Sequence, residues 1–101
     1  MKKYAICLND ELIGYIRHLL TKYHAENAIV FGSYARGEAT ITSDIDIIVI
    51  GGKNFQRTDI FAFGEDLRNL TGKNVDAFEI SELDKGTPFY DNVMQEGIKV
   101  A

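Results

Sequence analysis

Two aspartates stand at the start of the most apolar segment of the chain. Asp44 and Asp46 lead into Ile47-Ile48-Val49-Ile50, and the β-branched residues over 45–50 predict a buried central strand. Because a strand points residues i and i+2 to the same face, the two carboxylates should project together. Carboxylates this close repel each other, and one is pushed towards protonation unless a cation holds both. Hard oxygen ligands of this kind select Mg²⁺ or Mn²⁺.

A third aspartate, Asp76, lies near the start of another predicted strand, over residues 74–80. If the two strands are neighbours, Asp76 completes a three-carboxylate cluster that can hold two ions. The alternative is that each carboxylate is an ordinary strand-end or turn residue, and for any single aspartate this is the simpler interpretation. The pair Asp44 and Asp46 favours a chemical role, because a solvated turn does not usually lead straight into such an apolar run.

An anion site is predicted upstream of the aspartates, where the apolar strand over residues 28–31 ends at Gly32. Gly32 permits a tight backbone turn, and a short helix is expected to begin at Ser33. Backbone N–H groups at that point, together with the serine hydroxyl, suit a phosphate group. Arg36 could contact a phosphate oxygen or brace a carboxylate. A plain turn and a surface arginine are the alternatives for these residues.

The elements that must position these residues alternate in type along the chain. The first is an amphipathic helix over 10–24, capped by Asn9, after an extended lead over 4–8. The others are a strand over 28–31, a turn, helical turn and loop over 33–43, a strand over 45–50, a helix from Thr58 to Gly72, a strand over 74–80, a short helix from Pro88 to Gly97 and an edge strand over 98–100. This order predicts an α/β (α+β) domain with a mixed sheet of three to four strands flanked by helices.

Composition narrows the class of protein. The 101 residues predict a single domain, 1–101, and a net charge of −4 argues against direct nucleic-acid binding. No apolar run approaches the ~20 residues of a membrane span. Cys7 is the only cysteine, so no intrachain disulfide can form, and we expect a buried thiol and a cytoplasmic protein.

Together, Gly32-Ser33, ten further residues, Asp44-Ile45-Asp46 and the later Asp76 resemble the nucleotidyltransferase superfamily that includes DNA polymerase β. The string from Gly32 to Gly37, followed by Ser43 to Asp46, resembles its minimal nucleotidyltransferase (MNT) branch. The resemblance implies a polymerase β-like fold in which Gly32 and Ser33 grip the triphosphate of ATP. It also implies that Asp44 and Asp46 bind two Mg²⁺ or Mn²⁺ ions, and that Asp76 binds one and helps to deprotonate the acceptor hydroxyl.

Members of the MNT branch commonly act as antitoxins of HEPN-domain toxins. The resemblance therefore implies transfer of AMP from ATP to a tyrosine hydroxyl of a HEPN-type toxin. The 101 residues leave no room for a separate acceptor-binding domain, which favours a protein acceptor. Two alternatives stay open. One is an antitoxin that neutralises its partner by binding only, and the other is a nucleotidyltransferase acting on a small-molecule hydroxyl.

Overall fold

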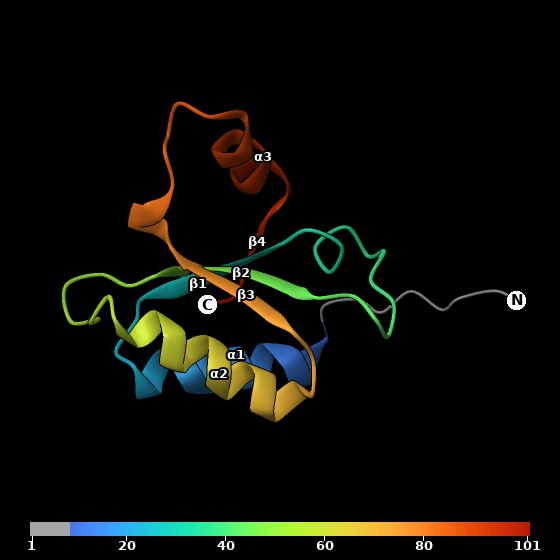
Figure 1. Cartoon of the computed structure of the whole chain (residues 1–101), viewed down its shortest axis with the longest axis horizontal. Helices are drawn as coiled ribbons and strands as arrows, with labels where there is room; N and C mark the ends of the chain where they lie inside the picture. Colours follow the sequence, from blue (N-terminus) through green and yellow to red (C-terminus); the bar gives the residue numbers. More distant parts are fainter. Residues whose placement is uncertain (1–8) are drawn as a thin grey trace, which may run out of the picture.

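A mixed four-stranded sheet forms the centre of the computed structural model, which describes residues 9–101 (Figure 1). The strands are β1 (Asn27–Phe31), β2 (Ile45–Ile50), β3 (Val75–Glu79) and β4 (Ile98–Lys99), in the order β3-β2-β1-β4. β1 pairs antiparallel with both β2 and β4, whereas β2 and β3 run parallel. The predicted mixed sheet flanked by helices is therefore confirmed.

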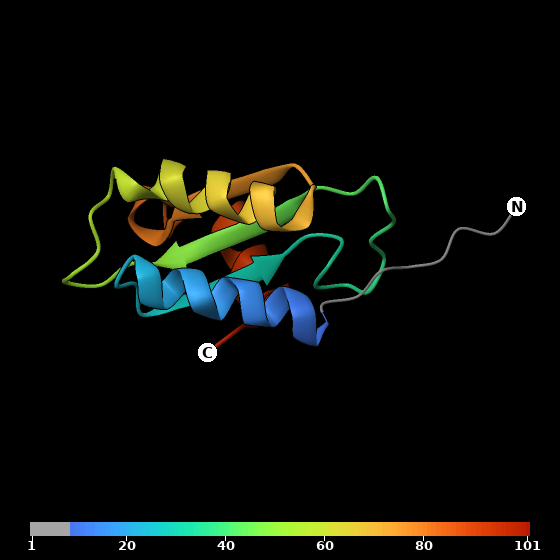
Figure 2. The same ribbon diagram turned by 90° about the horizontal axis from the view of Figure 1, so that it is seen from below.

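Helices cover both faces of this sheet. α1 (Asp10–Lys22) and α2 (Asp59–Thr71) lie side by side on one face, and α3 (Pro88–Glu96) lies on the other (Figures 1 and 2). None of the described helices is long and apolar enough to cross a membrane. The expected extended lead over 4–8 and the buried thiol of Cys7 lie outside the described residues.

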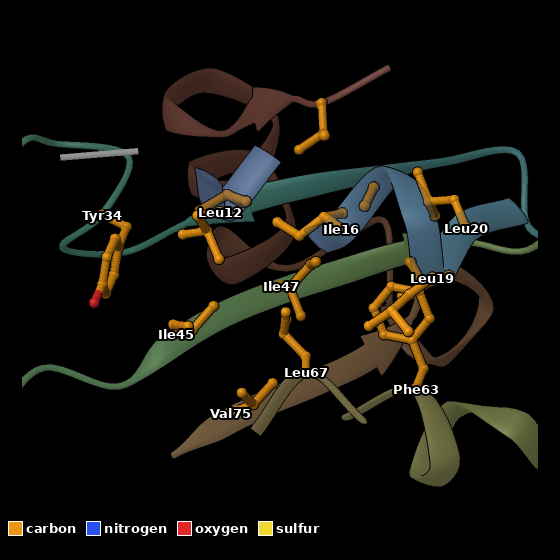
Figure 3. Close-up of a cluster of buried hydrophobic side chains, with 14 of the residues drawn as sticks. Leu12, Ile16, Leu19, Leu20, Tyr34, Ile45, Ile47, Phe63, Leu67 and Val75 are labelled. Atoms are coloured by element: carbon orange, nitrogen blue, oxygen red, sulfur yellow. The ribbon is translucent and has the colours of Figure 1, made fainter. Parts of the chain in front are cut away.

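The alternation of side chains along β2 divides the molecule into two layers. Ile45, Ile47 and Val49 point into the main core, between the sheet and the pair α1 and α2, as Figure 3 shows for the first two. Ile48 points the other way, into a smaller cluster with Ile29 and Val93 beneath α3. Burying both faces of the strand explains why its sequence is almost continuously apolar. Residues at even positions of β2 therefore belong to the α3 side of the sheet.

Most of the predicted helix boundaries are confirmed by cap hydrogen bonds. The Asn9 side chain accepts from the Leu12 amide at 2.9 Å, and Gly72 ends α2 with φ +70°. Thr58 precedes α2, but its backbone is already helical and its side chain makes no capping hydrogen bond, so this predicted cap is wrong. β3 stops at Glu79, one residue earlier than predicted, because the chain turns there into a 3-10 helix, η1 (Ile80–Glu82).

The buried Glu79 carboxylate fixes that turn to the end of β2. It accepts hydrogen bonds from the Gly51 amide at 3.1 Å and the Ser81 amide at 2.9 Å. Burial raises the pKa of Glu79, but these hydrogen bonds and that from the Ser81 hydroxyl outweigh it and leave the pKa below its usual value. No pattern in the sequence indicated this carboxylate, which closes the parallel β2–β3 pair at the end away from Asp46.

An ion pair between α1 and α2 makes stability depend on pH. Asp66 Oδ2 accepts from Lys22 Nζ at 2.7 Å and from the Tyr23 hydroxyl at 2.5 Å, and these hydrogen bonds lower the pKa of Asp66. Because the folded pKa is depressed, the stabilisation is complete above the unfolded value of about 3.9 and is lost as pH falls from there through the lower, folded pKa.

We expect Asp66→Asn to lower the free energy of unfolding at pH 7 by about 0.5–1 kcal/mol, since the pair is partly exposed and solvent screens it. Urea denaturation at pH 7 and pH 3 checks this, and Glu65→Gln, which removes an exposed ion pair to Arg68 within α2, is the comparison. The difference between wild type and Asp66→Asn should be smaller at pH 3 than at pH 7. An unchanged midpoint at pH 7 would contradict the prediction.

Candidate active site

Asp46 and Asp76 face each other across the parallel pair of strands. The register sets Asp46 of β2 opposite Asp76 of β3, with Phe31 of β1 on the other side of Asp46. The prediction that these two strands are neighbours in the sheet is therefore confirmed. Both aspartates lie on the α3 side of the sheet, because their neighbours Ile45, Val75 and the other odd-numbered residues fill the core beneath. The site is thus on the sheet face that α3 only partly covers.

The three aspartates differ in their surroundings. Asp46 is half-buried, whereas Asp44, one residue before β2, and Asp76 are exposed. Burial raises the pKa of Asp46, the Asp76 and Asp44 carboxylates raise it further, and the Arg36 charge opposes them. Negative charge is therefore concentrated around Asp46 with little to offset it.

The turn after β1 passes close to Asp46, and only glycine fits there. Gly32 has φ +70°, a conformation that L side chains rarely adopt. A Cβ atom at this position would overlap Asp46 Oδ2. The end of β1 is therefore in contact with the carboxylate, so the predicted anion site and the predicted acidic site are one place in the structure.

Residues 32–37 form a single turn, so the short helix expected to begin at Ser33 is absent. The Arg36 amide donates to the Gly32 carbonyl at 3.1 Å and the Glu38 amide to the Ser33 carbonyl at 2.9 Å. Gly37 then adopts φ +71° and ends the helical geometry after one turn. The buried ring of Tyr34, 3% exposed, ties this turn to the core under the sheet (Figure 3).

Arg36 lies at the edge of the site and is held by two carboxylates. Its Nε donates to Glu38 Oε1 at 2.5 Å, and a guanidinium nitrogen lies 3.7 Å from Glu96 Oε2 on α3. The side chain is 46% exposed, so it is accessible to a ligand. Its contact with a phosphate stays a prediction.

The donor set at Asp46 fits a hard divalent cation. Carboxylate oxygens are the ligands that Mg²⁺ prefers, and the two facing carboxylates, with Asp44 nearby, leave negative charge that a cation would neutralise. As the side chains stand, no group of three or more His, Cys, Asp or Glu residues within 9–101 is arranged to hold a metal ion. The exposed Asp44 therefore has to turn towards the other two, or phosphate oxygens have to complete the ligand set.

A pocket beside Gly32 was not foreseen from the sequence. Its volume is about 250 Å³, and one of its walls is α3. We call it the α3 pocket, and its lining residues are Phe31, Gly32, Arg36, Phe89, Asn92, Val93 and Glu96. The residues from α3 recur at i, i+3, i+4 and i+7, which is one helix face. That spacing was visible, but nothing in the sequence indicated which part of the chain the face meets.

Known proteins similar to this chain are nucleotidyltransferases. The sequence profile of the family described as "Polymerase beta, Nucleotidyltransferase" matches residues 15–101. A protein of Methanocaldococcus jannaschii, described as a "putative protein adenylyltransferase", is 33% identical over 91 residues, which cover 90% of this chain and 96% of that protein.

Two solved complexes contain chains of the same fold. A toxin–antitoxin complex with AMP-PNP matches with TM-score 0.74 at 21% identity, over 88% of this chain and 72% of that chain. A complex of tri-AMPylated Shewanella oneidensis HEPN toxin with MNT antitoxin matches with TM-score 0.67 at 18% identity, over 89% of this chain and 69% of that chain.

Proposed function

Because the chain belongs to the polymerase beta nucleotidyltransferase family, we propose that it is an antitoxin that transfers AMP from ATP to a tyrosine hydroxyl of a HEPN-type toxin. One observation carries the proposal: the turn at Gly32 and the aspartate of β3 both meet Asp46. A phosphate group held at the turn would therefore lie beside the carboxylates that must act on it.

The residues of the site have two roles, phosphate binding and metal binding. Gly32 and Ser33 hold the triphosphate, with Arg36 at its edge. Asp44, Asp46 and Asp76 would hold two Mg²⁺ or Mn²⁺ ions, whose charge would stabilise the entering hydroxyl oxygen and the departing pyrophosphate in an in-line displacement at the α-phosphate. Asp76 is exposed, so a hydroxyl group of another protein can reach its carboxylate and give up a proton there.

Two findings support a protein acceptor. The M. jannaschii relative is described as a protein adenylyltransferase, and an antitoxin of the same fold forms a complex with an AMPylated HEPN toxin. The site also lies on an open sheet face rather than in a deep cleft, which suits a large acceptor. The binding-only antitoxin is the less favoured alternative, because a contact surface gains nothing from two carboxylates facing each other, Asp46 and Asp76, with Asp44 nearby. Transfer to a small-molecule hydroxyl is the other alternative.

The experiment that tests the proposal is the intact mass of the partner. The purified chain is incubated with a candidate HEPN-domain partner protein, ATP and Mg²⁺, and the partner should gain the mass of one or more AMP groups. A parallel reaction with small hydroxyl compounds and no partner should give no product. An unmodified partner in an inactive complex would instead show neutralisation by contact.

Ser33→Ala tests the phosphate grip. We expect the variant to bind ATP more weakly by about 1.5–3 kcal/mol, the value of a hydrogen bond to a charged group. Its fold should be unchanged, because Ser33 is a half-buried turn residue and not part of the core. Calorimetry with ATP and Mg²⁺ measures the difference. Ser81→Ala is the control, because Ser81 lies in η1, beyond the end of β3 away from Asp76. Equal ATP affinity in wild type and Ser33→Ala would remove Ser33 from the site.

A further inference from the structure

The α3 pocket opens next to the proposed phosphate site. Gly32 and Arg36 belong both to the pocket and to the turn that contacts Asp46. Whatever part of a nucleotide is linked to the phosphates at that turn is therefore within reach of the pocket. A volume of about 250 Å³ is slightly below the ~300–1,000 Å³ of sites that enclose a whole small molecule. The pocket thus suits one ring system and not a complete nucleotide.

The walls of the pocket suit a flat aromatic ring. Phe31 and Phe89 pack edge to face with ring centroids 5.6 Å apart, and Phe89 is 47% exposed. An exposed phenyl ring beside a pocket is a stacking surface for a nucleobase, and such stacking contributes about 1–3 kcal/mol per base. Phe89 is also one of the few large apolar side chains that the described fold leaves exposed, and a stacked base would cover it.

The polar groups of the pocket favour adenine among the bases. The Asn92 amide offers one donor and one acceptor side by side, which is the pattern that pairs with the amino group and ring nitrogen of adenine. Glu96, when ionised, only accepts hydrogen bonds, so it favours a base with an exocyclic amino group over one with a carbonyl there. Arg36, whose guanidinium lies 3.7 Å from Glu96 Oε2, adds a positive charge to the same wall of the pocket.

We propose that the α3 pocket holds the adenine ring of the nucleotide and that Asn92 selects it. The inference rests on the proposed function for the position of the phosphates, and it adds the element that chooses the base. It assigns a function to α3 beyond covering the smaller apolar cluster around Ile29 and Ile48.

Binding measurements without any partner protein test this inference. Calorimetry in Mg²⁺ compares ATP, GTP and CTP with inorganic tripolyphosphate, which has no base. The wild-type chain should prefer ATP, and Asn92→Leu should lose about tenfold in ATP affinity, since one or two hydrogen bonds are removed. Tripolyphosphate affinity should stay within twofold. Phe89→Ala should weaken all three nucleotides and spare tripolyphosphate.

Gln95→Leu is the matched control, because Gln95 is exposed on the same helix and does not line the pocket. It should leave every affinity unchanged, and circular dichroism should show that Asn92→Leu, Phe89→Ala and Gln95→Leu are all folded. An unchanged ATP-to-GTP ratio in Asn92→Leu would overturn the inference, as would an equal loss of tripolyphosphate binding or a wild-type chain without base preference. If the base preference follows Asn92 but no partner is modified, the proposed function fails and the adenine pocket stands.

Discussion

Replacing Asp46 with asparagine is expected to abolish AMP transfer to the partner while the protein stays folded and still binds that partner. Asp46 is the residue on which the other parts of the site converge, with Asp76 opposite it in register and Gly32 against its carboxylate. Asparagine keeps the size of the side chain but removes the charge. Losing such electrostatic stabilisation lowers turnover by at least about 10²–10³-fold.

Co-expression with the HEPN-type toxin measures this result as growth of the host and as partner mass. Wild type should protect and modify the partner, and Asp46→Asn should do neither. Asp10→Asn is the control, because Asp10 is an exposed residue at the start of α1, on the opposite side of the sheet. Full protection by a folded Asp46→Asn variant, with an unmodified partner, would establish neutralisation by binding alone.

The same substitution should stabilise the metal-free protein at neutral pH. Burial and two neighbouring carboxylates raise the pKa of Asp46, so the folded state binds a proton more tightly than the unfolded state does. Wild-type stability therefore rises as pH falls through the folded pKa, and the advantage of asparagine disappears there. Urea denaturation in EDTA at pH 7 and pH 3 should show the gain only at pH 7.

Gly32→Ala is expected to lower transfer at least about a hundredfold, because a new methyl group would push the Asp46 carboxylate out of place. It should also destabilise the fold, because alanine at φ +70° costs about 1–2 kcal/mol before any overlap is counted. Steady-state transfer to the partner and urea denaturation give the two quantities separately.

Gly72→Ala separates these two effects. Gly72 has the same φ of +70°, but a Cβ atom there would have no neighbour within 4 Å. This control should therefore show the conformational destabilisation and retain full activity. If Gly32→Ala loses no more activity than Gly72→Ala does, the contact between the turn and Asp46 has no part in the reaction.

The parts of the fold that follow from local chemistry could be predicted from the sequence. The β-branched run at 45–50 predicted β2, and Asn9, Gly72 and Pro88 marked helix ends, because caps and turns depend on nearby backbone groups. The helix expected at Ser33 did not form, since Gly37 leaves the helical region one turn later. The sequence alone does not show whether a glycine four residues after Ser33 adopts a positive φ.

The part of the candidate site that lies on one strand could be predicted from the sequence. The part that joins two strands could be predicted only on the assumption that they are neighbours. The spacing of Asp44 and Asp46 predicted a shared face, but β2 begins only at Ile45, so Asp44 lies just outside the strand. The position of Asp76 depended on the order of strands, which periodicity does not give. The α3 pocket could not be predicted. Phe89, Asn92 and Glu96 look like an ordinary amphipathic helix face, and their nearness to Gly32 arises only because α3 crosses the sheet face opposite α1 and α2.

The strict alternation along β2 has a consequence for how this protein can change during evolution. Ile45, Ile47 and Val49 belong to the main core, while Asp46 belongs to the site, so substitutions at the odd positions act mainly on stability and those at Asp46 mainly on chemistry. Insertion or deletion of one residue within Ile45–Ile50 is different. It would turn the carboxylate into the core and isoleucines into the site at once. Natural variation in this strand should therefore consist of residue exchange at constant length.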